Sequence, residues 1–162
     1  MSTLALGLAY ALASSQLSTP RTLAKIEFFT ATTVFDAQVT ENDPAGLNRK
    51  FVITCLRGCR RFPVYTEKVE FFPLGLFRLT DAYPLLLTTW AGGTVTHFKV
   101  YVLEPEGVRV ALDEYTIGTP TISSRGGVLS VSAAQYADEG AGSHRKMLSR
   151  TWVWKNGRFQ GH

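Results

Sequence analysis

Hydrophobic and polar positions alternate with a period of two along most of the chain from Ile26 onward. Between residues 29 and 39, apolar residues or threonine occupy the odd positions, while threonine, aspartate and glutamine occupy most of the even ones. Successive side chains of a strand point to opposite faces of its sheet, so this pattern predicts β-strands. The β-branched residues of the stretch also disfavour helix. A short helix over residues 20–28 is the alternative there, because Thr19-Pro20 is a favourable helix start.

Turn-forming residues recur along the chain and divide it into short apolar segments. Turns are predicted at residues 41–46, 73–75, 91–94, 104–107, 125–127 and 156–157. The last of these, Asn156-Gly157, is a strong signal for a type I′ hairpin turn, because both residues tolerate a positive φ. About ten short strands joined in this way predict an all-β antiparallel meander. The meander closes as a barrel, a sandwich or a small propeller-like stack, and the sequence leaves these three open.

One further pattern bears on the choice of architecture. The segments that begin at Trp90 and at Trp152 both run from a tryptophan through a glycine turn to a phenylalanine, and they lie 62 residues apart. Two loose copies do not define the repeat of a propeller. The sequence therefore predicts no internal repeat that would favour a propeller over the other two closures.

The core is predicted from the apolar runs and from the alternation within strands. Phe71-Phe72 and Leu85-Leu86-Leu87 are predicted core segments. In the strand expected over residues 95–103, Phe98, Val100 and Val102 share one face, which places His97, Lys99 and Tyr101 on the other. A histidine beside a lysine on that second face is expected to point to solvent, with a binding or catalytic role as the alternative.

The first thirteen residues are set apart by their composition. Leu4 to Ala13 is an uncharged apolar stretch, and Ala11-Leu12-Ala13 fits the small-x-small rule for signal cleavage before Ser14. The positively charged segment that usually precedes such a stretch is missing here. A signal with an upstream start, a short signal as written, and a short apolar docking helix therefore stay open. Export to the periplasm or the medium is the prediction, with a cytoplasmic protein as the alternative.

The rest of the chain has the size and composition of one domain. Of the 162 residues, 45% are hydrophobic and 19% are charged, which suits a single folded unit with an ample core. We expect this β domain to span residues 14–162. No apolar run reaches the roughly 18 residues that a membrane-spanning helix requires.

The only two cysteines, Cys55 and Cys59, frame a short segment that contains Gly58. If strands over residues 51–54 and 60–65 flank Leu56-Arg57-Gly58 as a hairpin loop, the two cysteines face each other. The sequence therefore predicts a Cys55–Cys59 disulfide, which would suit an oxidising compartment. Two reduced core thiols and a redox pair are the alternatives, although redox pairs usually have the C-x-x-C spacing.

Basic residues are concentrated in two segments without any acidic residue, Pro44 to Thr66 and Gly140 to His162, although the net charge of the chain is only +4. If both segments lie on one face, they would attract an anionic partner; ordinary solvated surface charge is the alternative. Trp154 adds an aromatic group on a face shared with Trp152, which is either a core ladder or a binding platform. The candidate binding residues are Arg57, Arg60, Arg61, Arg150, Trp154, Lys155 and Arg158.

No recognisable catalytic, nucleotide-binding or nucleic-acid-binding motif is present, so no catalytic residue, cofactor or nucleic-acid partner is predicted. The three histidines are too scattered for a zinc site, and no metal ligand is predicted. The sequence favours a noncatalytic exported binding module, inhibitor-like or immunity-like, that recognises a protein or an envelope polymer. An enzyme with a noncontiguous site for an anionic or carbohydrate substrate is the alternative, and a component that assembles through a sheet edge is another. The oligomeric state is left open.

Overall fold

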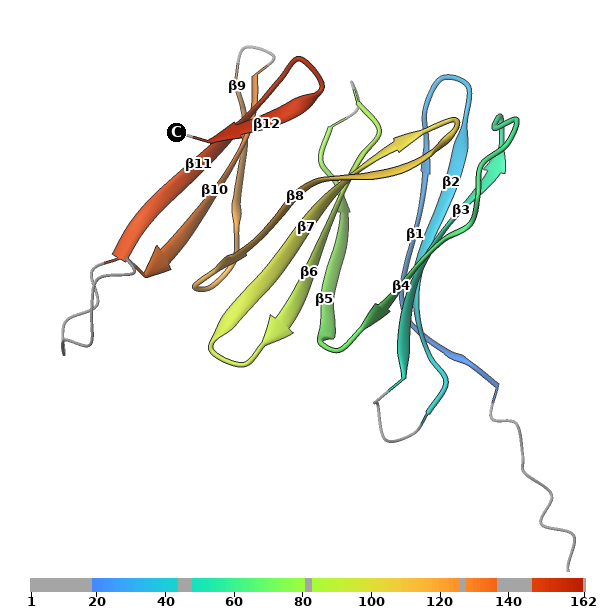
Figure 1. Cartoon of the computed structure of the whole chain (residues 1–162), viewed down its shortest axis with the longest axis horizontal. Helices are drawn as coiled ribbons and strands as arrows, with labels where there is room; N and C mark the ends of the chain where they lie inside the picture. The colour runs from blue at the N-terminus through green and yellow to red at the C-terminus, as the bar shows by residue number, and fades with distance from the viewer. Residues whose placement is uncertain (1–18, 44–47, 81–82, 126–127, 137–146, 162) are drawn as a thin grey trace, which may run out of the picture.

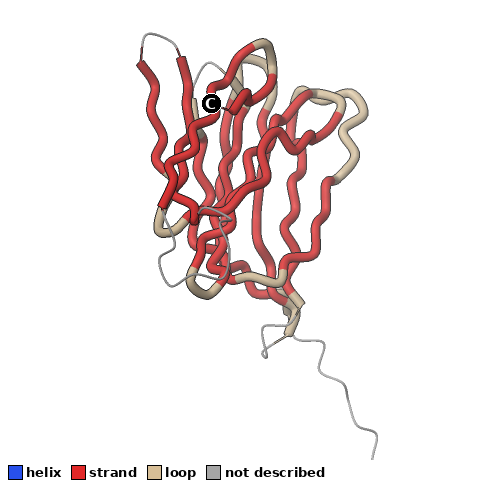
Figure 2. Tube along the Cα trace, turned by 60° about the vertical axis from the view of Figure 1, so that its left-hand side comes forward, coloured by secondary structure: helices blue, strands red, loops and turns tan. Residues whose placement is uncertain are grey.

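The computed structural model describes residues 19–43, 48–80, 83–125, 128–136 and 147–161. This part of the chain contains twelve β-strands and no helix, which confirms the all-β prediction. The strands form three antiparallel sheets of four strands each, and each sheet is a meander of four consecutive strands (Figure 1). Figure 2 shows the strands aligned roughly along a common axis, with the sheets layered against one another.

Each sheet is named here by its order in the chain. Sheet 1 contains β1 (Arg21–Phe29), β2 (Val34–Glu41), β3 (Arg49–Arg57) and β4 (Tyr65–Val69). Sheet 2 contains β5 (Phe72–Arg78), β6 (Leu85–Gly92), β7 (Val95–Glu104) and β8 (Gly107–Thr116). Sheet 3 contains β9 (Thr121–Arg125), β10 (Val128–Tyr136), β11 (Met147–Lys155) and β12 (Arg158–Gly161).

The first strands of the three sheets begin about 50 residues apart, so the chain has a structural repeat. The two tryptophan phrases do not mark this repeat. Trp90 lies on the second strand of sheet 2, whereas Trp152 lies on the third strand of sheet 3. Trp90 and Trp152 therefore occupy positions that are not equivalent in the fold.

Sheet 2 is the middle layer, and both of its faces are buried. Leu86 joins the core cluster that sheet 2 shares with sheet 1, while Leu85 and Leu87 join the cluster that it shares with sheet 3. All three side chains are at most 1% exposed. A strand that is covered on both faces needs apolar side chains at consecutive positions, which explains the leucine run and confirms it as core.

Adjacent sheets do not approach each other evenly. Sheets 1 and 2 come closest along β1 and β5, whereas sheet 2 approaches sheet 3 through β8, which lies against β10 and β12. Sheet 1 therefore lies closest to the β5 edge of sheet 2, and sheet 3 lies closest to the opposite edge, β8. This leaves the space between β4 and β7 to be filled by long polar side chains, which form the candidate site described below.

Two of the alternatives left open for the architecture are excluded within the described residues. The described strands form three separate sheets, so the barrel is excluded for this part of the chain. The alternative helix over residues 20–28 is a strand, β1, which pairs along β2 with Ile26 opposite Ala37 and Phe28 opposite Phe35. Strand pairing and the burial of Phe28 prevail over the helix-start signal of Thr19-Pro20. The apolar stretch from Leu4 to Ala13 and the cleavage position lie outside the described residues.

The predicted turn at residues 73–75 is wrong. Pro73 lies inside β5, opposite Trp90, and a register shift follows between Pro73 and Gly75. An edge strand tolerates proline, because one side of its backbone has no strand to pair with, and the bulge accommodates the irregular residues. The chain instead leaves sheet 1 at Glu70-Phe71, and the predicted core residues Phe71 and Phe72 are 42% and 51% exposed rather than core.

The Cys55–Cys59 disulfide is confirmed. Its surroundings differ from the expected short hairpin, because β3 continues to Arg57 and β4 begins only at Tyr65. Gly58 has the expected positive φ, 86°. A Cβ at this position would overlap the backbone carbonyl oxygen of Thr32, so the loop lies directly against the β1–β2 turn.

The type I′ turn is confirmed by the positive φ angles of Asn156 and Gly157, 51° and 75°. It sets Trp154 opposite Phe159, with ring centroids 5.0 Å apart. The register of the last hairpin is therefore the one that the sequence predicts.

Candidate functional site

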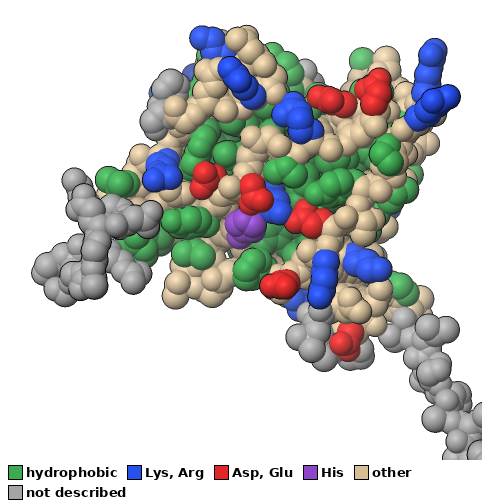
Figure 3. Space-filling view, viewed as in Figure 1, with side chains coloured by type: hydrophobic (Ala, Val, Ile, Leu, Met, Phe, Trp, Pro, Cys, Tyr) green, Lys and Arg blue, Asp and Glu red, His purple; other side chains and the backbone are tan. Residues whose placement is uncertain are grey.

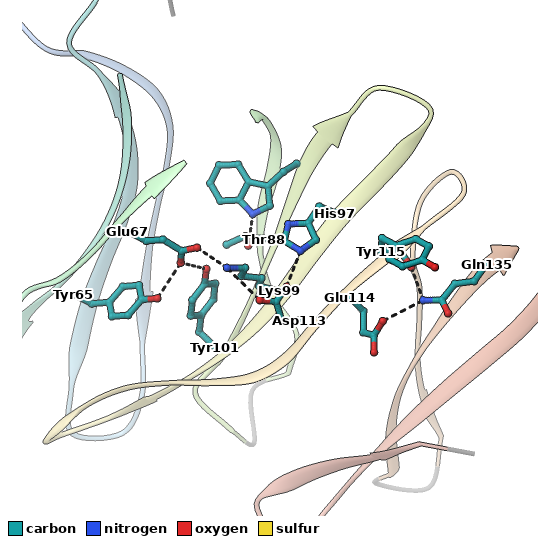
Figure 4. A network of polar contacts seen from close by, with 11 residues as sticks. Tyr65, Glu67, Thr88, His97, Lys99, Tyr101, Asp113, Glu114, Tyr115 and Gln135 are labelled. Atoms are coloured by element: carbon teal, nitrogen blue, oxygen red, sulfur yellow. Dashed lines mark hydrogen bonds and ion pairs between the residues drawn. The ribbon is translucent and has the colours of Figure 1, made fainter. Parts of the chain in front are cut away.

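A network of charged side chains crosses the space between sheets 1 and 2 (Figure 4). Glu67 on β4 receives hydrogen bonds at both carboxylate oxygens. Lys99 Nζ on β7 lies 2.5 Å from Glu67 Oε1, and the hydroxyls of Tyr65 and Tyr101 each donate to Oε2 over 2.9 Å. Glu67 thus links β4 to β7 through two donors, Lys99 and Tyr101, and the third donor, Tyr65, comes from its own strand.

The network of charged side chains extends from β7 to β8. Lys99 Nζ lies 3.3 Å from Asp113 Oδ2, and His97 Nε2 lies 2.6 Å from Asp113 Oδ1. The Lys99 side chain is only 15% exposed, whereas Asp113 is 47% exposed. The cluster therefore runs from a sheltered pair, Glu67 and Lys99, to a more open pair, His97 and Asp113.

The surroundings of the sheltered pair hold both groups in their charged forms. Partial burial disfavours the ionised Glu67, but the hydrogen bonds from Lys99, Tyr101 and Tyr65 outweigh burial and lower the pKa of the carboxyl group. Burial likewise disfavours protonated Lys99, but Glu67 and Asp113 raise its pKa overall. Burial and the neighbouring Glu67 raise the pKa of both tyrosine hydroxyls, so they stay neutral donors.

A small pocket opens beside this cluster, with a volume of about 180 Å³. Its polar wall contains Glu67, Lys99 and His97, and its aromatic wall contains Phe71 and Trp90. The Phe71 ring meets the His97 ring edge-on at 6.0 Å. Figure 3 shows the one histidine of the described residues at the molecular surface, with acidic and hydrophobic side chains beside it.

Trp90 contributes its ring rather than its N–H group to this pocket. Its Nε1 donates to Thr88 Oγ1 over 2.9 Å, and its ring packs against Phe51 of the core. The indole is only 2% exposed. The pocket wall is therefore fixed by the core before any ligand arrives.

The expectation that His97 points to solvent holds only in part, although the alternation of β7 is right. His97, Lys99 and Tyr101 do share a face, but that face is covered by sheet 1, and the His97 side chain is 30% exposed. The sequence does not indicate which sheet packs on this face. Tyr101, an aromatic residue on the supposed solvent face, was the available signal that the face is covered.

The candidate residues of the first basic segment lie in the connection from β3 to β4. Arg57 is the last residue of β3. Arg60 and Arg61 follow the disulfide and line a second pocket of about 530 Å³ with Gly58 and two residues of the β7–β8 turn. Neither arginine is part of the charged cluster around Glu67.

The candidate residues of the second basic segment lie on sheet 3. Arg150 and Lys155 lie on β11, and Arg158 faces Lys155 across the hairpin. Trp154 packs between Phe159 and Tyr83, whose ring centroid is 6.0 Å away. Trp152 is 8% exposed and belongs to the core between sheets 2 and 3, as the core-ladder alternative expects.

The two basic segments are therefore on the two outer sheets, with sheet 2 between them. On the face shown in Figure 3, lysine and arginine side chains form separate groups with acidic side chains among them. Sequence reasoning missed Glu67 and Asp113 because neither belongs to a motif. Only the packing of β4 against β7, and the pairing of β7 with β8, brings them to Lys99.

Comparisons of the chain with models of known protein families, with curated proteins and with solved structures found no match. Within the described ranges, no group of three or more histidine, cysteine or acidic residues is placed to hold a metal ion. The same ranges contain no helix that is long and apolar enough to cross a membrane.

Proposed function

We propose that the chain is a noncatalytic binding module, and that it recognises a protein or an envelope polymer through the pocket beside Glu67 and Lys99. The observation that carries this proposal is the pairing of the charged groups at the pocket. Glu67 and Lys99 are bound to each other and to further partners. Their charged groups are therefore held in fixed positions in the pocket wall before a ligand binds.

The same pairing argues against acid–base catalysis by these two groups. A general acid or base works best when its pKa lies near the operating pH. The surroundings move the pKa of Glu67 down and that of Lys99 up, away from neutrality in both cases. A carboxylate prepared for general acid catalysis would instead have a raised pKa.

The size of the pocket supports recognition of part of a larger ligand. Sites for whole small molecules usually have volumes of roughly 300–1,000 Å³. A pocket of about 180 Å³ suits one sugar ring or one side chain. The exposed ring of Phe71 can pack against such a group, while Glu67, Lys99 and His97 offer polar contacts around it.

A retention experiment with a matched pair of variants tests this proposal. Wild-type protein, Phe71→Ala and Phe77→Ala are immobilised and exposed to fragments of envelope polymers and proteins. Phe71 and Phe77 are similarly exposed, 42% and 47%, but only Phe71 lines the pocket. We expect wild type and Phe77→Ala to retain a ligand, Phe71→Ala to lose it, and the eluted ligand to be chemically unchanged. Conversion of the ligand, or equal retention by both variants, would contradict the proposal.

Export is part of the proposal. The disulfide between Cys55 and Cys59 supports it, because such bonds persist in oxidising compartments. We expect the mature protein to begin at or near Ser14, as measured by mass spectrometry of protein isolated from its natural host. An intact Met1 in a cytosolic fraction would contradict export.

A further inference from the structure

A groove at the far end of sheets 1 and 2 has features of a second binding site. His97 lies near the beginning of β7, and Pro105 follows its end, so the groove and the pocket beside Glu67 are at opposite ends of the same strand. Pro105 lines both the arginine pocket of about 530 Å³ and a neighbouring pocket of about 520 Å³. The two hollows therefore adjoin at Pro105 of the β7–β8 turn, and together they are named here the turn groove.

The arginines at one end of the turn groove are available to a ligand. Within the described residues, neither Arg60 nor Arg61 takes part in an ion pair. Among the described residues that line the arginine pocket, Glu106 is the one acidic residue, so the positive charges exceed the negative there. Guanidinium groups without internal partners favour binding of carboxylate or phosphate oxygens.

The loop that carries these arginines is held in place. The Cys55–Cys59 disulfide closes its first turn, and Gly58 lies against the carbonyl of Thr32. Beyond the arginines, the Phe62 ring packs 5.5 Å from the ring of buried Phe35. Anchors on both sides restrict the backbone of Arg60 and Arg61, which lowers the entropy cost of ordering them around a ligand.

The other end of the turn groove is lined by aromatic rings and threonines. Phe29 and Tyr83 are 55% and 46% exposed and line the groove beside Thr32, whereas the hydroxyl of Thr30 is already bonded to Thr33 within the β1–β2 turn. The Tyr83 ring packs against Trp154, one of the candidate binding residues predicted from the sequence. Trp154 thus positions Tyr83 in the groove. Exposed rings suit the apolar faces of sugars, and hydroxyl groups suit their polar edges.

We propose that the turn groove binds a segment of an acidic polysaccharide, with a sugar carboxylate at Arg60 and Arg61 and a neighbouring ring against Phe29 or Tyr83. The combination of free arginines with aromatic and hydroxyl surfaces favours such a ligand over an acidic peptide. This site goes beyond the pocket beside Glu67 and does not require that pocket to bind anything.

Calorimetric titration with defined probes tests the inference on the full chain. A tetramer of galacturonic acid is compared with a tetramer of galactose, its neutral counterpart, and with hexaglutamate. We expect the acidic tetramer to bind, with affinity that falls as salt rises, and the neutral tetramer to bind at least about tenfold more weakly. No binding of the acidic tetramer, or equal binding of the neutral one, would overturn the inference. Stronger binding of hexaglutamate would also overturn it, in favour of an acidic protein partner.

Variants locate the binding within the molecule. Arg60→Gln with Arg61→Gln should weaken binding of the acidic tetramer at least about tenfold, because charge-assisted hydrogen bonds are lost. Phe29→Ala should weaken the acidic tetramer and not inorganic phosphate, which has no ring. Arg21→Gln is the control, since Arg21 is an exposed arginine at the other end of sheet 1. Equal affinity of the double variant and Arg21→Gln would overturn the inference, provided that circular dichroism shows both variants folded like wild type.

Discussion

Replacing Glu67 by glutamine should destabilise the contact between sheets 1 and 2 without changing the volume of the side chain. Glutamine can still accept hydrogen bonds from the hydroxyls of Tyr65 and Tyr101. It carries no charge, however, so the pair with Lys99 is lost as an ion pair. Lys99 keeps Asp113 Oδ2 at 3.3 Å, which limits the damage.

The size of the effect follows from the burial of the pair. Two opposite charges in contact attract by about 4 kcal/mol where the effective dielectric constant is near 20. The Glu67 and Lys99 side chains are 26% and 15% exposed, so solvent screens part of this attraction. Removing the charge also removes the cost of burying it. We therefore expect Glu67→Gln to reduce the free energy of unfolding by about 2 kcal/mol at neutral pH.

The pH dependence gives this prediction a sharper form. The folded-state pKa of Glu67 is lowered, so its contribution to stability is present above the ordinary value of 4.5 and is lost as the pH falls through the folded pKa. Urea unfolding of wild type and Glu67→Gln at several pH values measures the difference. We expect it to be largest near neutral pH and to shrink steadily below pH 4.5.

Glu104→Gln is the control for this experiment. Glu104 pairs with Arg109 at 3.7 Å, but its side chain is 52% exposed, and an exposed pair contributes less than about 1 kcal/mol. If Glu67→Gln costs no more than Glu104→Gln, or if its cost does not change with pH, the charged cluster does not stabilise the contact between the sheets.

Other predictions concern the loops and the aromatic packing. Gly58→Ala should reduce the free energy of unfolding in urea more than Gly157→Ala does. Both glycines have a positive φ, but only at Gly58 would a Cβ meet the backbone of another segment. We expect a loss of about 1 kcal/mol at Gly157 and of more than about 3 kcal/mol at Gly58. Equal costs would contradict the close approach. Thiol titration of unreduced, denatured protein should find neither Cys55 nor Cys59 free, and reduction should cost at most about 2 kcal/mol, because the closed loop is short. Trp154→Ala should destabilise the fold by about 3 kcal/mol in the same assay, because its ring packs on two others; an unchanged midpoint would show that the ring is a free platform.

The strands could be predicted well where local patterns decide their positions. Asn156-Gly157 predicted the last turn because few residue pairs tolerate a positive φ at both positions. The leucines of β6 indicated burial because a run of apolar side chains is stable only where both faces of the strand are covered. The turn predicted at Pro73 is wrong because proline is excluded from central strands but not from edge strands. Which strand is an edge strand becomes clear only once the pairing is known.

The candidate site could not be predicted in the same way. The alternation of β7 correctly grouped His97 with Lys99, but whether that face meets solvent or sheet 1 depends on contacts between distant segments. Glu67 and Lys99 are 32 residues apart in the chain. The pairing of these two residues is a product of sheet packing, and no local pattern encodes it.

In the proposed function, the pocket beside Glu67 and Lys99 is the recognition site. Two-dimensional ¹H–¹⁵N NMR of the labelled protein, titrated with the ligand that the immobilised chain retains, tests it directly. We expect the indole signal of Trp90 and the backbone amides of Phe71 and His97 to shift progressively, because these residues line the pocket. Shifts confined to the β11–β12 hairpin around Trp154 and Arg158, with the Trp90 signal unmoved, would contradict the claim.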